Sequence, residues 1–178
     1  MDNQDNIILR PLKLSDAGLM LEWMHDPQMQ SGFKKDMLHV SLEQAQMFCR
    51  TAATDMEDDE STNRHWAISD TDGEYLGTIS LKNIDRDNSK AEYAIALRKK
   101  ACGRGIGTAA TRLLLKKAFL ELDLHKVYLT VLEDNLHAIR MYERNGFVCE
   151  GMLREHLKIG NRYVGWKLYA IIRSDYIS

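Results

Sequence analysis

A glycine-rich segment, Cys-Gly-Arg-Gly-Ile-Gly-Thr at 102–108, lies between an extended-looking stretch and a stretch with the apolar spacing of a helix. Gly105 and Gly107 carry no Cβ atoms, so backbone N–H groups can approach a ligand closely there. A helix that begins near Thr108 adds unpaired N–H groups and the positive end of its dipole. Arg104 contributes a further positive charge. The segment predicts a site for a phosphate or pyrophosphate; the alternative is a tight turn without a ligand.

Two nucleotide-binding patterns compete with this interpretation. Residues 105–110 fit the G-x-G-x-x-A fingerprint of dinucleotide-binding folds, and Glu133 ends the next extended stretch. However, residues 99–104 separate the preceding strand from the first of these glycines, whereas a dinucleotide-binding fold turns almost at once. The unit also lies in mid-chain, and the residues after Glu133 are too few to supply the missing strands and helices. No Gly-Lys-Ser/Thr follows the glycines, which excludes a P-loop.

The first third of the chain predicts one strand and two helices joined by loops. The strand is expected at 6–12, and apolar residues at helical spacing predict helices at 17–24 and 41–54. Residues 25–37 and 55–63 predict loops, the second of which is rich in Asp and Glu.

The rest of the chain predicts extended segments interrupted by two helices. The helices are expected at 108–122 and 135–145, and Gly146 is a natural terminator for the second. The expected strands are 65–69, 74–84, 90–98, 126–133, 147–159 and 163–173. Short turns join most of the strands, and one β-α-β unit lies in the middle. We therefore expect one α/β domain over residues 1–178, with a mostly antiparallel sheet whose two strands beside the central helix run parallel.

The composition is that of an ordinary soluble chain, with 44% apolar residues, 28% charged residues and a formal net charge of −2. This charge offers no basic surface to nucleic acid or anionic lipid. No apolar stretch approaches the roughly 18 residues of a membrane span, and the first residues lack the apolar region of a signal peptide. The three cysteines and six histidines show no zinc-type spacing. We expect a cytoplasmic protein with no metal site, no nucleic-acid partner and no membrane association.

The glycine-rich segment resembles the acetyl-CoA loop of the GNAT N-acetyltransferases, whose pattern is Gln/Arg-x-x-Gly-x-Gly/Ala. Residues 135–147, Asn-Leu-His-Ala-Ile-Arg-Met-Tyr-Glu-Arg-Asn-Gly-Phe, resemble that family's Asn-x-x-Ala…Tyr…Gly-Phe helix. Both motifs stand in the family's order and spacing, and the resemblance covers nearly the whole chain. Cys102 occupies the position where the family usually has Gln or Arg. The resemblance implies the GNAT fold, a mixed sheet flanked by helices whose parallel strands splay apart at the acetyl-CoA site.

The resemblance also implies which residues hold acetyl-CoA. They are Ile95, Ala96, Leu97, Gly103, Arg104, Gly105, Ile106, Gly107, Thr108, Asn135, Ala138 and Arg144. The first three are implied to run beside the pantetheine arm, with the N–H of Leu97 directed at the thioester oxygen in an oxyanion-type interaction. Arg144 is implied to reach a cofactor phosphate; the alternative is a solvated position on the helix.

Two residues are implied to take part in catalysis. A primary amine has a pKa of about 10.4 and must lose a proton before it attacks. Glu92 matches the position of a base carboxylate in many relatives and would act directly or through water. Tyr142 matches the family's tyrosine, which faces the sulfur and donates a proton to the leaving thiolate. The alternatives are a strand-end Glu that is solvated or paired with a lysine, and a tyrosine that belongs to the core.

The acceptor is implied to be a primary amine of a small molecule. Residues 20–27 and the closing hairpin resemble amino-sugar acetyltransferases of the pseudaminic-acid type, which we favour. Residues 107–131 resemble spermidine acetyltransferases, and the acidic residues 55–60 suggest attraction of a polycation, unless they form a solvated loop. A protein N-terminus is a third candidate. A non-catalytic acetyl-CoA-binding module is the alternative of another class, and a homodimer also stays open.

Overall fold

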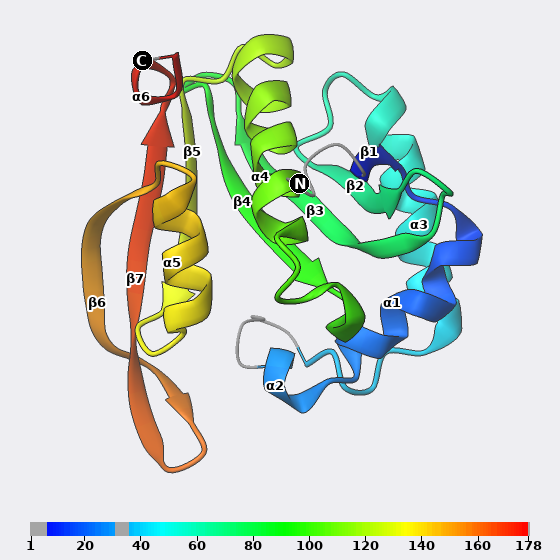
Figure 1. The fold of residues 1–178 in the computed structure, drawn as a ribbon, viewed down its shortest axis with the longest axis horizontal. Coiled ribbons are helices and arrows are strands. Elements are labelled where there is room, and N and C mark those ends of the chain that lie inside the picture. The colour runs from blue at the N-terminus through cyan, green and yellow to red at the C-terminus, as the bar shows by residue number, and fades with distance from the viewer. Residues whose placement is uncertain (1–6, 31–35, 178) are drawn as a thin grey trace.

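A seven-stranded sheet forms the centre of the fold in the computed structural model, which describes residues 7–30 and 36–177. The strands lie in the order β1-β2-β3-β4-β5-β7-β6 (Figure 1). Neighbouring strands run antiparallel except β4 and β5, which run parallel. This confirms the predicted mixed sheet; Asn6, the first residue of the expected strand 6–12, lies outside the described residues. The strands are β1 Ile7–Pro11, β2 Arg64–Asp70, β3 Tyr75–Asp85, β4 Lys90–Leu97, β5 Lys126–Leu132, β6 Val148–Ile159 and β7 Arg162–Ile172.

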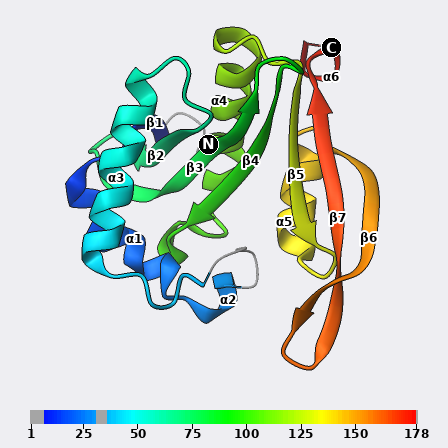
Figure 2. The same ribbon diagram turned by 180° about the vertical axis from the view of Figure 1, so that it is seen from behind.

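Helices cover both faces of this sheet (Figures 1 and 2). α1 and α3 lie on one face, over the half that contains β1 to β4, whereas α4 and α5 lie on the opposite face. The helices are α1 Ala17–Met24, α2 Pro27–Gln30, α3 Leu42–Glu57, α4 Ile106–Lys116, α5 Leu136–Arg144 and α6 Arg173–Ile177. A π-helical turn, Lys117–Glu121, continues α4. Among the described residues, no helix combines the length and the apolar character needed to cross a membrane.

Two hydrophobic cores hold the helices against the sheet. Ala110, Leu114 and Ala118 recur at helical spacing along the central helix, and each is fully buried against the strands. Leu122, which continues this spacing, is instead 37% exposed because the helix has ended. On the opposite face, α1 and α3 form a second core with residues of β2, β3 and β4. Burial of apolar surface on both faces therefore fixes where each helix sits.

The short helix α2 was not predicted, because the sequence indicates a loop throughout 25–37. Pro27 takes the first helical position, where its missing N–H is no loss. The Asp26 carboxylate accepts a hydrogen bond from the N–H of Gln28 at 2.9 Å, as a capping residue does. Residues 31–35 of the expected loop lie outside the described residues. α2 matters for function because it borders the cleft described below.

Two further helix boundaries differ from the sequence prediction. The helix expected at 41–54 extends to Glu57, so the first residues of the expected loop at 55–63 are helical. The central helix begins at Ile106 instead of Thr108. Gly105 is its N-cap and adopts a left-handed conformation that glycine accepts without strain. The anion-binding N–H groups predicted near the helix start are therefore those of 106–108.

β4 and β5 separate soon after they start, which opens the sheet (Figure 2). Their parallel pairing joins only residues 90–92 to residues 126–128. In the described sheet the rest of β4 pairs with β3 alone, and the rest of β5 pairs with β7 alone. The edges that border the opening carry backbone N–H and C=O groups without a strand partner.

Candidate active site

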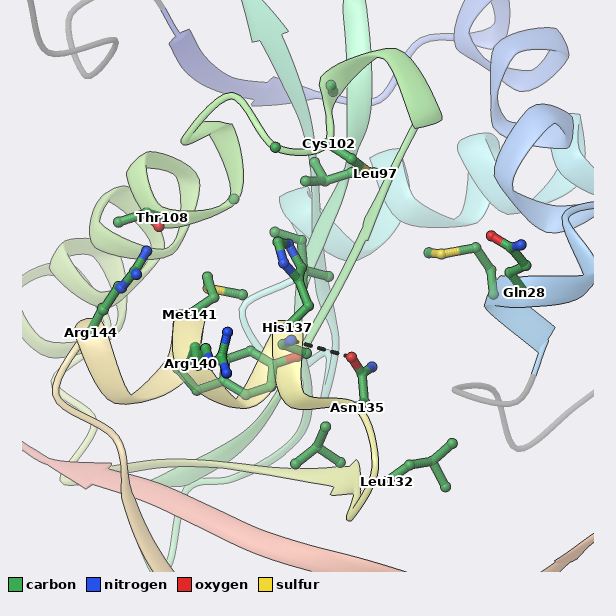
Figure 3. Close-up of a pocket in the computed structure, with 18 of the residues that line it drawn as sticks. Gln28, Leu97, Cys102, Thr108, Leu132, Asn135, His137, Arg140, Met141 and Arg144 are labelled. Atoms are coloured by element: carbon green, nitrogen blue, oxygen red, sulfur yellow. Dashed lines mark hydrogen bonds between the residues drawn. The ribbon is translucent and has the colours of Figure 1, made fainter.

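A cleft of about 460 Å³ lies at the opening between β4 and β5 (Figure 3). The end of β4 and the glycine-rich segment form one side, and β5 and α5 form the other. Gln28 and Met29 of α2 and Trp166 of β7 complete its border. Elements that are far apart in the sequence thus meet at the two motifs singled out by the sequence prediction.

The glycine-rich segment forms an open cradle at the start of α4. Gly103 and Gly105 have φ angles of 73° and 79°, which glycine adopts without strain. A Cβ atom built on either glycine would meet no atom within 4 Å, so the space in front of the segment is open. The first bond inside the helix runs from the Ala109 N–H to the Gly105 carbonyl at 3.0 Å. The N–H groups of 106–108 therefore have no acceptor within the helix and are available to an anion.

The exposed edge of β4 contributes a second set of backbone donors. Arg98 donates its N–H to the Leu76 carbonyl of β3 at 2.9 Å. Successive N–H groups of a strand point to opposite edges, so the N–H of Leu97 points toward β5, where the ladder has already ended. The side chains of Ile95 and Leu97 line the cleft. Ala96 points its side chain to the other face, into the core with α1 and α3.

Tyr142 belongs to the hydrophobic core and also borders the cleft. Its ring is 8% exposed and packs edge-to-face on Tyr93, with 5.7 Å between ring centroids, yet it also lines the cleft. Among the described residues its hydroxyl has no hydrogen-bond partner. Burial raises the pKa of Tyr142 to about 12. The phenol therefore stays protonated at neutral pH and can donate a hydrogen bond into the cleft.

The first residues of α5 line the cleft from the side opposite the glycines. Asn135 caps the helix, because its carbonyl oxygen accepts a hydrogen bond from the Ala138 N–H at 3.2 Å (Figure 3). Arg140 and Arg144 stand one helical turn apart and both line the cleft, as does His137. The two arginines give this wall a positive character.

Three residues of the glycine-rich segment differ in what they offer the cleft. Arg104 is exposed and does not line the cleft, and the side chain of Ile106 is buried in the core, so its contribution is its N–H. Cys102 does line the cleft, and its thiol approaches the Arg98 carbonyl at 3.6 Å. Burial raises the pKa of Cys102, so this thiol adds no charge.

Glu92 does not line the cleft, and its side chain lies on the other face of the sheet. Because side chains alternate along a strand, Glu92 faces away from the side on which Ile95 and Leu97 lie. Its carboxylate is largely buried, with 8% of the residue exposed. Oε2 accepts a hydrogen bond from Nδ2 of Asn83 at 2.7 Å, and Oε1 is 3.5 Å from Nζ of Lys82. Glu92 therefore has the lysine partner that the alternative interpretation expected.

The cleft continues through the opening toward the face on which Glu92 lies. Glu92 pairs with Tyr128, and alternation places Thr130 and Leu132 on the same face as Tyr128. Leu132 pairs in turn with Trp166 of β7. Thr130, Leu132 and Trp166 all line the cleft. The opening thus connects the α4–α5 face, which bears the glycines and Tyr142, to the face that bears Glu92.

Several cleft residues were not found from the sequence. Arg140 escaped notice, although it lies one turn before Arg144 and helical spacing would have found it. His137 was interpreted as a surface or helix-end group, yet it lines the cleft. Thr130 and Trp166 depend on strand pairing, for which the sequence gives no signal by itself. Across residues 7–30 and 36–177, no group of three or more His, Cys, Asp or Glu side chains could hold a metal ion.

Comparison with known proteins agrees with this geometry. The model of the GNAT acetyltransferase domain matches residues 6–148. A spermidine N(1)-acetyltransferase of Vibrio cholerae is 31% identical over 119 residues, which is 67% of this chain and 69% of the relative. The spermidine N(1)-acetyltransferase of Escherichia coli K12 is 24% identical over 178 residues, which is 100% of this chain and 92% of the relative.

A solved structure shows the same fold with its ligands. It is the spermidine N-acetyltransferase from Vibrio cholerae in complex with CoA and spermine, which is 25% identical and has a TM-score of 0.86. The similarity covers 98% of this chain and 99% of that chain. Because the family model spans well over half of the residues and the fold agrees with it, this chain belongs to the GNAT acetyltransferase family and is an acetyl-CoA-dependent N-acetyltransferase.

Proposed function

We propose that this chain acetylates a primary amine of a small molecule and that the amine belongs to an amino sugar. The observation that carries this choice is the charge around the cleft. Arg140 and Arg144 line it, and among the described lining residues there is no Asp or Glu. Lys82 also stands 3.5 Å from the carboxylate of Glu92. A polyamine carries several positive charges and is best bound by unpaired carboxylates, whereas an uncharged or phosphate-bearing sugar tolerates this surface.

The described residues fit acetyl-CoA, which supplies an acetyl group activated as a thioester. The open cradle of glycines and the N–H groups of 106–108 suit the pyrophosphate. Arg140 and Arg144 are available to further phosphate oxygens. The N–H of Leu97 offers a donor where negative charge grows on the carbonyl oxygen. Tyr142 holds its proton toward the cleft and would donate to the departing sulfur.

The amine is proposed to enter from the face on which Glu92 lies. A bond forms between the amine nitrogen and the acetyl carbon, the carbon–sulfur bond breaks, and the nitrogen loses a proton. Glu92 would accept this proton, directly or through one water molecule. A base and an acid on opposite faces of the opening keep the incoming and leaving groups apart.

A polyamine is the second candidate, because two spermidine acetyltransferases are among the relatives. The acidic residues 55–60, which suggested a polycation, do not line the cleft. They lie at the end of the sheet where β4 begins. Arg64 donates hydrogen bonds to the carbonyls of Asp55 and Asp58, and Arg86 donates to that of Glu60 at 3.2 Å. These arginines offset part of the acidic charge.

Release of thiol from acetyl-CoA with a panel of amines tests the acceptor. The panel contains a nucleotide-linked amino sugar, glucosamine, spermidine, spermine, an aminoglycoside and a peptide with a free N-terminus. We expect kcat/KM for an amino sugar to exceed that for spermidine by about 100-fold, the difference that about 2.7 kcal/mol produces. Preference for spermidine would reverse the acceptor choice. A rise in Tm with acetyl-CoA but no turnover with any amine would indicate a binding module instead.

The bare backbone at Gly107 gives a separate test of cofactor binding. A Cβ atom here would lie 3.4 Å from Cδ1 of Leu97, an ordinary contact, so a larger side chain fits the fold but occupies the border of the cleft. We expect Gly107→Val to raise the Kd for acetyl-CoA about tenfold or more, a loss of about 1.4 kcal/mol. Gly18→Val, in the exposed helix position where nothing lies within 4 Å, is the matched control and should leave the Kd unchanged. Equal affinities in the two variants would place the anion elsewhere.

A further inference from the structure

β3 contains a bulge directly opposite Glu92. Lys82 pairs with Glu92, but the next pair joins Asp85 to Lys90, so two residues of β3 face the single residue between Lys90 and Glu92. Asn83, the first of the two, has a φ of 51°. Asn tolerates this left-handed conformation better than most residues because its short side chain can hydrogen-bond locally. Bulges of this kind re-aim side chains.

The bulge brings two consecutive side chains to the same carboxylate. In a regular strand, residues 82 and 83 would point to opposite faces of the sheet. Here Nδ2 of Asn83 donates to Oε2 of Glu92 at 2.7 Å, while Nζ of Lys82 lies 3.5 Å from Oε1. The backbone N–H of Asn83 is directed at Oδ1 of Asn63, 3.4 Å away, which helps to hold the left-handed turn.

We propose that Asn83 is a positioning residue for the base. Its amide fixes one oxygen of Glu92 and thereby sets the orientation of the carboxylate toward the opening between β4 and β5. This inference rests on the proposed role of Glu92 as the proton acceptor.

Other charged groups surround Glu92 and act on it as well. Lys82 comes from β3 and Tyr128 from β5, and Asp85 lies near Tyr128 at the end of β3. From β2, His65 approaches Lys82, but burial lowers the pKa of His65 to about 4, so it is neutral at working pH. Asp55 of α3 lies near His65. Asn83 is the neutral donor in this set, and its removal changes no charge.

Asn83→Gly tests the proposal with little strain, because glycine adopts positive φ freely and keeps the bulge. We expect kcat to fall about tenfold, with the KM for acetyl-CoA unchanged and Tm within about 2 °C of wild type.

A double variant separates positioning from a structural role. If Asn83 acts through Glu92, adding Asn83→Gly to Glu92→Gln should cause no further loss of kcat. Ser89→Gly, at a residue with φ 48° in the next turn, is the matched control and should behave as wild type. Additive losses, or a wild-type kcat in Asn83→Gly, would overturn the inference on Asn83. The Glu92→Gln single variant tests the role of Glu92 as the base. A failure of that role can therefore be distinguished from a failure of the positioning role of Asn83.

Discussion

Tyr142→Phe is expected to lower kcat roughly 10²–10³-fold, within the usual range for loss of a catalytic acid. The lost atom is the hydroxyl that faces the cleft, and it has no hydrogen-bond partner among the described residues. The ring contacts with Tyr93 and Phe147 remain. The KM for acetyl-CoA and the free energy of unfolding should therefore change little. Stopped-flow turnover and thermal unfolding measure the two effects separately.

The matched control for this experiment is Tyr93→Phe. The Tyr93 hydroxyl is buried and lies 2.7 Å from Oγ1 of Thr111, which itself donates to the Gly107 carbonyl at 2.7 Å. Its loss should cost about 1 kcal/mol of stability and leave kcat within about threefold. Equal rate losses in the two variants would show that Tyr142 acts through packing instead of through its proton.

The raised pKa of Tyr142 adds a pH dependence to this prediction. With a pKa of about 12 in the folded protein, the phenol keeps its proton well above the point at which a free tyrosine ionises. Its contribution to the rate should therefore persist to about pH 11 and fall only above it. A free thiol has a pKa of about 8.5. In its proposed role, Tyr142 would therefore stabilise the departing thiolate by hydrogen bonding more than by complete proton transfer.

The fold was predictable because its signals are local. Apolar residues at helical spacing identified α4, and the turn residues between extended stretches identified the antiparallel strands. The role of the glycines was also predictable from the sequence, and Gly103 and Gly105 do adopt positive φ angles. What the sequence could not give was the side of the sheet on which each side chain falls, because strand register depends on pairing over long distances.

The candidate site shows where that limit matters. Tyr142 and Glu92 were singled out together, yet they lie on opposite faces of the sheet, joined only by the opening between β4 and β5. The contact of Asn83 with Glu92 exists because one extra residue in β3 reverses the alternation. α2 was missed because Pro27 was read as a loop signal instead of the first residue of a helix. The contact between Asn83 and Glu92 thus depends on the pairing of strands, which local propensity does not determine.

Glu92→Gln should lower kcat/KM roughly 10²-fold at pH 7, because the protonated amine then has no acceptor for its proton. The defect should shrink as pH rises toward the pKa of the acceptor amine, above which the amine loses its proton unaided. The pH profile of the variant should thus rise steadily, without the plateau of the wild type. Glu150→Gln is the matched control, since Glu150 also pairs with a lysine, Lys126, at 2.6 Å, but belongs to the edge strand β6. If Glu92→Gln gives the wild-type profile, another group or bulk water removes the proton, and the carboxylate of Glu92 has a structural role with Lys82 and Asn83.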